Sequence, residues 1–231
     1  MQESQLKHQQ TQQSCIENLA LQLLQQAGIK PTPKLLSQIN LYIEQLQTWN
    51  KSINLTGIHD PEELLIKHLG DTLLLLPYIP DNAQTLLDIG SGAGVPGLIL
   101  KLLRPELKIT LVEATRKKVS FLKTVIFKLG LSGIVAEHGR IGDQGVPKHK
   151  PPKGFDVITA RALTSLELLI DLAIPLLASH GKLLAMKGPK GMSELKASQQ
   201  KLQQYGLIAK AQEAKLPILG HKRVIIEVEK K

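Results

Sequence analysis

The first third of the chain is patterned as helices. Apolar side chains recur every three or four positions from Ile16 to Ala27, which is the spacing of one helix face, and Gly28 ends the pattern. Thr32-Pro33 and Asp60-Pro61 each place a capping residue before a proline, a pairing typical of a helix start. The pattern therefore predicts helices at 16–27, at 33–49 and from 61 to just before Pro77.

The rest of the chain alternates between two patterns. Short apolar runs predict strands at 85–89, 108–112, 133–137, 155–159, 182–186, 207–215 and 224–228. Helical spacing predicts helices at 96–103, 117–129, 166–177 and 193–205. Strands that alternate with helices indicate a mostly parallel sheet covered on both faces, a doubly wound α/β fold. Only a turn around 217–220 joins the last two strands, which predicts a terminal antiparallel hairpin.

Composition divides the chain into three segments. Residues 1–13 are polar and Gln-rich, and we expect them to be disordered. Residues 14–80 are expected to form an N-terminal helical extension, and residues 81–231 the α/β domain. Within that domain, residues 143–153 are rich in lysine and proline and are expected to form a basic surface loop.

The segment from Asp88 to Gly97 joins the first predicted strand to the helix after it. Gly90, Gly92 and Gly94 alternate within it, and glycine allows a sharp turn whose backbone a ligand can approach closely. The second predicted strand ends at Glu113, about 20 residues further on, where an acid accepts hydrogen bonds from ribose hydroxyls. Together these features predict a nucleoside-cofactor site. The alternative is a tight strand-to-helix turn that binds nothing.

The glycine spacing can be matched to two kinds of cofactor. Gly92-x-Gly94-x-x-Gly97 is a loose form of the dinucleotide turn. Asp88-x-Gly90-x-Gly92-x-Gly94 fits more closely and resembles motif I of the class I methyltransferases, which bind S-adenosylmethionine. That cofactor carries a sulfonium cation and no phosphate, so an acid such as Asp88 suits it. We therefore expect S-adenosylmethionine, bound by Asp88, Gly90, Gly92, Gly94 and Glu113 among others.

Bulk composition narrows the partner and the compartment. The 231 residues carry a net charge of +9, which favours a polyanionic partner, although a merely basic protein is the alternative. Aromatic residues make up only 3%, so phosphate contacts should outweigh base stacking. Cys15 is the only cysteine and fits a reducing compartment. No apolar run reaches the ~18–20 residues that span a membrane, and no signal-peptide pattern is present, so we expect a cytoplasmic protein.

Six motifs follow one another in an order that is specific to one family. They are Trp49-Asn50-Lys51-x-x-Asn54-Leu55-Thr56, His68-x-x-Asp71-Thr72-Leu73, the Asp88–Gly97 segment, Arg116-Lys117-Lys118-x-x-Phe121-Leu122, Ala160-Arg161-Ala162 and Met186-Lys187-Gly188. Over about residues 35–228 this series resembles the glucose-inhibited division protein B family, also called ribosomal RNA small-subunit methyltransferase G.

The resemblance implies both a fold and an activity. The fold is that of a class I methyltransferase, a Rossmann-like sheet of seven mostly parallel strands with a terminal antiparallel strand. The activity is methylation of a guanine N7 in 16S ribosomal RNA, with S-adenosylmethionine as donor. We expect the RNA to be presented within a small-subunit particle, and the protein to be a monomer that needs no metal and no membrane.

The resemblance also implies cofactor contacts. By this resemblance they are Gly90, Val95, Ile141, Gly142 and Arg161, with Arg140 at a further position that the family uses. Ile141-Gly142-Asp143 departs from the family's small residue followed by Glu, so adenine contacts there must be mostly through the backbone. His221-Lys222-Arg223 leaves open the register of the family's basic pair before the last strand.

The sequence lacks the residues that other RNA methylations need. Methylation of a base carbon needs a cysteine nucleophile, and Cys15 lies far from the glycine turn. Methylation of an exocyclic amine typically uses Asn/Asp-Pro-Pro-aromatic after the fourth strand, where this chain has Thr159-Ala160-Arg161-Ala162. Guanine N7 carries its own lone pair, so positioning alone, worth up to ~7–11 kcal/mol, can supply catalysis.

The candidate catalytic residues are Arg161, Arg140, His68 and Asn54. A core histidine is the alternative for His68, and a turn or cap residue is the alternative for Asn54. The candidate RNA-binding residues are Lys117, Lys118, Lys187 and Arg223. A solvated helix face is the alternative for the first two lysines, and a snorkelling lysine is the alternative for Lys187.

Two rival functions remain. A nicotinamide-dependent dehydrogenase would use the looser glycine register, but no residue supplies an acid for hydride transfer. A non-catalytic RNA-binding module could retain the cofactor fold. A methyl-transfer assay with labelled donor separates all three.

Overall fold

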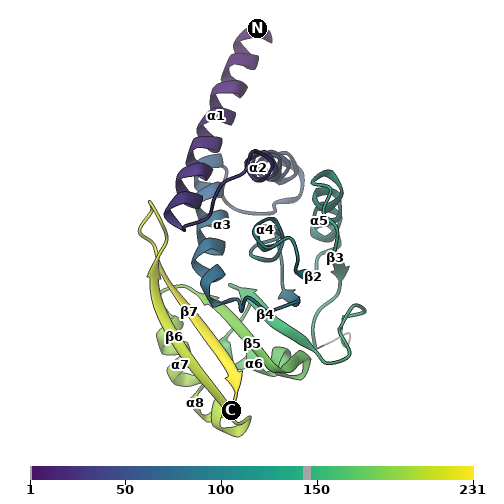
Figure 1. Ribbon diagram of the computed structural model, residues 1–231, viewed down its shortest axis with the longest axis vertical. Helices are drawn as coiled ribbons and strands as arrows, with labels where there is room; N and C mark the ends of the chain where they lie inside the picture. The colour runs from purple at the N-terminus through teal and green to yellow at the C-terminus, as the bar shows by residue number, and fades with distance from the viewer. Residues whose placement is uncertain (1, 143–146) are drawn as a thin grey trace.

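In the computed structural model, which describes residues 2–142 and 147–231, one twisted sheet lies between two layers of helices (Figure 1). Met1 and residues 143–146 of the expected basic loop lie outside the described part of the chain. No helix in the described ranges is long and apolar enough to cross a membrane.

Three helices open the chain: α1 (Gln2–Gln26), α2 (Pro33–Ile53) and α3 (Pro61–Leu75), followed by the 3-10 turn η1 (Leu76–Tyr78). The two predicted helix starts are confirmed, because Thr32 accepts a hydrogen bond from the Leu35 amide and Asp60 accepts one from the Glu63 amide. The expectation of disorder at 1–13 does not match the structure, in which α1 begins at Gln2 and extends away from the body of the molecule (Figure 1). Glutamine is a good helix former, and no Gly or Pro interrupts this segment.

All seven predicted strands are present. They are β1 (Thr85–Ile89), β2 (Lys108–Glu113), β3 (Ile134–His138), β4 (Phe155–Arg161), β5 (Leu177–Lys187), β6 (Leu207–Lys215) and β7 (Lys222–Lys230). Their order in the sheet is β3-β2-β1-β4-β5-β7-β6. The first five strands pair in parallel, and β7 pairs antiparallel with both β5 and β6. The predicted α/β class, with a terminal hairpin, is therefore confirmed.

The helices between the strands are α4 (Gly97–Leu103), α5 (Arg116–Lys128), α6 (Leu166–Ala173), the 3-10 turn η2 (Ile174–Leu176), α7 (Gly191–Ala197) and α8 (Gln199–Gln204). The single helix expected at 193–205 is two helices, because Ser198 breaks the pattern. Its buried hydroxyl donates to the Glu194 carbonyl, and its backbone leaves the helical region.

Two hydrophobic cores lie on the two faces of the sheet. One combines α1–α5 with one face of β1 to β5 and β7, and the other combines α6–α8 with the opposite face (Figure 1). The front helices therefore share a core with the sheet rather than forming a separate unit. Strand order reverses between β1 and β4, and ligands of such folds bind at this point, beyond the carboxyl ends of the strands.

Candidate active site

The glycine turn after β1 is held open to solvent at its centre. Gly90, Gly92 and Gly94 all have positive φ, at 72°, 54° and 89°, which side chains rarely adopt. A Cβ on Gly94 would lie 2.8 Å from Leu98, but a Cβ on Gly92 would meet nothing closer than the Gly90 carbonyl at 3.8 Å. The backbone at Gly92 is therefore a surface that a ligand can approach, as a nucleoside cofactor requires.

Asp88 is an interior group of this turn. Its carboxyl accepts hydrogen bonds from the Gly97 amide at 3.2 Å and from the Thr159 hydroxyl at 2.8 Å. Burial raises the pKa of Asp88 to about 6. The expectation that Asp88 contacts the cofactor directly is corrected: its carboxyl is fully buried and ties β1 to β4 and α4.

Glu113 ends β2 and faces the same turn. One carboxyl oxygen accepts from the Gly92 amide at 3.0 Å, and the other accepts from the Thr115 amide at 2.8 Å. A carboxylate offers about four acceptor positions, so each oxygen retains capacity for a further donor. The structure thus brings Glu113 and Gly92 together, as the glycine motif and the strand-end acid predict.

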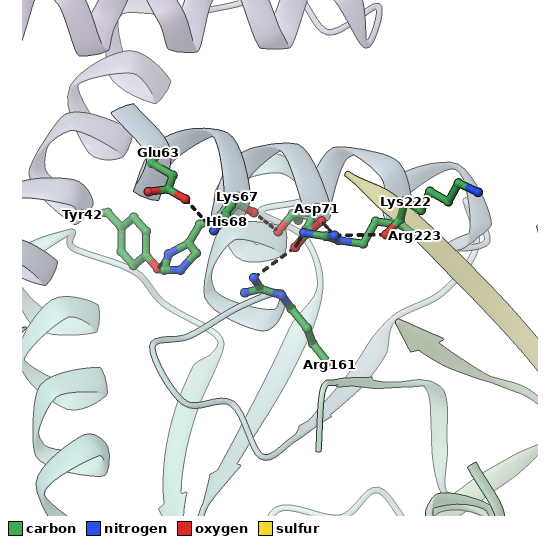
Figure 2. Close-up of polar contacts among 9 residues, drawn as sticks. Tyr42, Glu63, Lys67, His68, Asp71, Arg161, Lys222 and Arg223 are labelled. Atoms are coloured by element: carbon green, nitrogen blue, oxygen red, sulfur yellow. Dashed lines mark hydrogen bonds and ion pairs between the residues drawn. The ribbon is translucent and has the colours of Figure 1, made fainter. Parts of the chain in front are cut away.

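Arg161 ends β4 and shares a buried carboxylate with Arg223 of β7 (Figure 2). Arg161 Nη2 lies 3.0 Å from Asp71 Oδ2, and Arg223 Nε donates to Asp71 Oδ1 at 2.7 Å. The Asp71 side chain is 1% exposed, whereas those of Arg161 and Arg223 are 24% and 18% exposed. Two guanidinium groups on one carboxylate leave a net positive charge at this edge of the sheet.

His68 lies in the interior beside this cluster (Figure 2). Its Nδ1 is 2.9 Å from the Tyr42 hydroxyl, which donates to the Ala93 carbonyl of the glycine turn at 3.0 Å. With that proton used, the hydroxyl accepts from Nδ1–H. Burial, with lesser effects from Arg161 and Lys67, lowers the pKa of His68 to about 3. His68 is therefore a neutral core residue, which corrects its expected contact with substrate.

Asn54 is the left-handed residue that ends α2, with φ 50° and an exposed side chain. The loop after it is held by Asn50, whose amide accepts from the Thr56 N–H at 2.9 Å and donates to the Ile58 carbonyl at 3.3 Å. The structure thus gives Asn54 the helix-end role that was the alternative to catalysis.

Lys187 is buried. Its buried ammonium donates to the Thr164 carbonyl and lies 2.7 Å from a carboxyl oxygen of Glu194. The same oxygen of Glu194 accepts from the Leu166 amide at 3.0 Å. Lys187 therefore holds the loop after β4 against α7, which corrects its expected contact with RNA.

The remaining predicted residues lie along the carboxyl edge of β1, β2 and β3. Lys117 and Arg140 are exposed and Lys118 is half-buried, whereas Val95 and Ile141 are buried. Gly142 has φ 100°, and a Cβ there would lie 2.8 Å from Leu172. Within the described residues, no three His, Cys, Asp or Glu side chains are grouped to hold a metal.

The sequence is similar to known proteins over nearly its whole length. Residues 35–222 match the family described as rRNA small subunit methyltransferase G. The chain belongs to this family. The ribosomal RNA small subunit methyltransferase G of Syntrophotalea carbinolica is 36% identical over 94% of this chain and 99% of its own length. The protein of that name from Streptococcus equi subsp. equi is 38% identical over 90% of this chain and 89% of its own length.

Solved structures support the fold class. The precorrin-6y C5,15-methyltransferase of Geobacter metallireducens superposes with a TM-score of 0.53 at 17% identity, covering 69% of this chain and 87% of that one. At that identity the likeness concerns the fold alone. The fold and the family predicted from the sequence are therefore both confirmed.

Two residues of this family member were not assigned a role from sequence. Asp71 stands within one of the six motifs, and Tyr42 stands in none of them. Asp71 stands three residues after His68, on a helix face that also carries Leu64 and Leu75. An acid on an apolar helix face indicates a buried, paired carboxylate, and that signal was available. The identity of its partners was not, because Arg223 lies 152 residues away.

Proposed function

We propose that this protein transfers a methyl group from S-adenosylmethionine to N7 of a guanine in 16S ribosomal RNA, acting as a monomer in the cytoplasm on a small-subunit particle. The observation that carries the proposal is that Glu113 contacts Gly92 at the carboxyl edge of the sheet where Arg161 ends β4, beside the switch point between β1 and β4, in a member of this family. That point is where α/β folds bind nucleoside ligands.

The turn and Glu113 are suited to hold a nucleoside. Gly92 leaves its backbone open, and the Glu113 carboxylate beside it can accept from ribose hydroxyls while keeping both of its amide donors. When bound, S-adenosylmethionine supplies the methyl group on a sulfonium. The buried Asp88 supports this site indirectly by fixing the strand-to-helix turn.

Arg161 is suited to hold the base. One of its nitrogens contacts Asp71, and its side chain is partly exposed, so donors of the guanidinium can reach a ligand. Arginine commonly donates to the O6 and N7 edge of guanine. Donation to O6 orients the base and leaves the N7 lone pair available for the methyl group. Arg140, exposed after β3, is a second candidate at this edge.

No general base is required for this reaction. N7 carries a lone pair at neutral pH, and His68, which lies beside the Arg161 cluster, is buried with a pKa near 3. A group with so low a pKa is a weak base at neutral pH. Alignment of N7 with the methyl group is therefore the main contribution expected of the chain.

The deciding experiment is methyl transfer to defined RNA. Small ribosomal subunits from a strain lacking the enzyme, and 16S RNA extracted from them, are incubated with the protein and donor labelled in the methyl group. We expect label in 7-methylguanosine after nuclease digestion and mass analysis, and loss of label with Glu113→Ala. Label in another nucleoside, or none in either substrate, would contradict the proposal. Equal label in both substrates would contradict only the preference for a particle.

A further inference from the structure

A basic groove lies beside the turn of the β6–β7 hairpin, apart from the glycine turn. It has a volume of about 360 Å³ and is lined by Pro189, Glu213, Ala214, Lys215, Lys222, Arg223 and Val224. We call it the hairpin groove. Three cations and one acid line it, and no aromatic side chain does, so it offers charge and no stacking surface.

Two of its lysines face each other directly. Lys215 and Lys222 are paired in the antiparallel register of β6 and β7, so their side chains leave the same face of the hairpin. Like charges in directly opposite positions destabilise a strand pair. Both lysines are exposed, and neither makes an ion pair with a carboxylate of the described residues. A bound anion between them would remove this repulsion.

The lysine pair is held in a fixed place. Leu216, next to Lys215, is buried, and its side chain packs on α3 within 3.0 Å of where a Cβ on Gly70 would lie. The Leu216 amide also donates across the hairpin to the His221 carbonyl at 2.9 Å. The turn is therefore docked on α3, which also carries Asp71.

The hairpin groove lies close to the proposed methyl-transfer site. Arg161 pairs with Met186 of β5, and Met186 pairs with Ile225 of β7. Neighbouring strands are about 4.8 Å apart, so β7 runs about 10 Å from Arg161. Figure 2 shows Arg223 directed at Asp71 and the Lys222 side chain extending beyond it, away from Arg161. Side chains alternate along β7, so Arg223 leaves the face of the sheet that α3 covers and Lys222 leaves the face that α7 covers. A strand whose base reaches Arg161 therefore meets the lysine pair by crossing the carboxyl edge of the sheet at the hairpin turn.

We propose that Lys215 and Lys222 bind phosphates of the RNA strand that flanks the target guanine. The proposal rests on the proposed function, because it assumes that RNA reaches Arg161. Two flexible ammonium groups without a stacking partner suit a phosphodiester backbone, whose contacts position the strand and carry no sequence information. An acidic segment of a ribosomal protein is the other occupant that the experiment below distinguishes.

The test removes the two charges and measures the salt dependence of binding to extracted 16S RNA. The variant is Lys215→Gln with Lys222→Gln. Each phosphate contact contributes about 0.7–0.9 to the slope of log affinity against log salt, so the slope should fall by about 1.4–1.8. Affinity for S-adenosylmethionine should stay within twofold. The melting temperature should stay equal or rise, because the repulsion is removed.

The matched control is Lys108→Gln with Lys153→Gln. Both lysines are exposed and lie at the starts of β2 and β4, the opposite edge of the sheet, and the change in net charge is identical. This control should keep the wild-type slope, and Lys215→Arg with Lys222→Arg should restore it.

Three outcomes would overturn the proposal. Equal slopes in the hairpin variant and the control would show that only net charge matters. An unchanged slope in the hairpin variant would show that no phosphate binds there. A loss of affinity seen with small subunits and not with extracted RNA would assign the hairpin groove to a ribosomal protein. A wild-type protein that binds RNA with the expected slopes and transfers no methyl group would overturn the proposed function and leave the hairpin groove in place.

Discussion

At the scale of single residues, the site depends on acids that are mostly buried. Asp71, Asp88 and Glu113 are all buried, and each carboxyl accepts at least two hydrogen bonds or ion pairs. A buried carboxylate is tolerable only when such donors replace water. Each acid therefore fixes a neighbouring group: Asp71 fixes Arg161, Asp88 fixes the glycine turn, and Glu113 fixes Gly92.

The Asp71→Asn variant should show whether Asp71 positions Arg161 for methyl transfer or only stabilises the fold. The change leaves both arginines without their shared negative charge. Because both are partly exposed, the loss of unfolding free energy should be about 2 kcal/mol, below the 3–5 kcal/mol of a fully buried pair. Methyl transfer at saturating donor should fall about tenfold to a hundredfold, since small misplacements of a reacting group cost that much. Affinity for S-adenosylmethionine should change less than twofold.

A double-mutant comparison provides the control for Asp71. If Asp71 acts through Arg161, its replacement should have little further effect on turnover when Arg161→Lys is already present, and its full effect when Arg223→Lys is present. Additive effects in both backgrounds would show that Asp71 only stabilises the fold.

Asp88 should make stability depend on pH in an unusual direction. Burial raises its pKa from 3.8 to about 6 in the folded protein, so the folded state holds the proton more tightly than the unfolded chain. Its contribution is then complete below about pH 4 and is lost as pH rises through 6. About two pKa units correspond to about 3 kcal/mol. Between pH 4 and pH 7, the free energy of unfolding of Asp88→Asn should rise by about this amount relative to that of the wild type, as measured by denaturant unfolding. A difference in unfolding free energy that does not change between pH 4 and pH 7 would contradict this.

At the scale of elements, the helices and strands could be predicted because their patterns are local. Short apolar runs placed every strand, and Thr32 and Asp60 marked two helix starts. The glycine turn and Glu113 were predictable for the same reason, since one segment and one strand end carry them. Long-range contacts could not be predicted in this way. The partners of Lys187 and Asp71 come from other elements, and no spacing along the chain encodes them.

The front helices also support the glycine turn, through Tyr42 of α2. Tyr42→Phe deletes the hydroxyl that joins His68 of α3 to the Ala93 carbonyl, leaving two buried polar groups unsatisfied. We expect a loss of about 1–3 kcal/mol in unfolding free energy. Affinity for S-adenosylmethionine, measured by calorimetry, should fall about threefold to tenfold, because the Ala93 carbonyl of the turn is no longer held in place by a hydrogen bond. Tyr78→Phe in η1 is the control. An equal loss of stability with unchanged donor affinity would show that this chain of contacts serves packing alone.

At the scale of the whole molecule, one helical layer and one sheet edge enclose the site. The core of α1–α5 runs without interruption onto the sheet, so α3 delivers Asp71 and His68 to the carboxyl edge as a rigid part of the same body. The site acids are buried there, while Lys117, Arg140, Lys215 and Lys222 are exposed along that edge. The net charge of +9 is thus partly concentrated where RNA must arrive.

This distribution predicts that RNA binding is strongly dependent on salt and that the first turn of α5 contributes to it. Lys117→Ala with Lys118→Ala should lower the slope of log affinity against log salt by about 1.4–1.8, on extracted 16S RNA, while the donor still binds. Lys30→Ala with Lys34→Ala removes the same charge from exposed positions just before and within the start of α2, and should leave the slope as it is. When these changes are combined with those of Lys215 and Lys222, the two reductions in slope should add. The two lysine pairs lie on opposite sides of the switch point, one toward β2 and one toward β7, and share no contact. An affinity of the wild type that does not vary with salt would refute phosphate binding at both places.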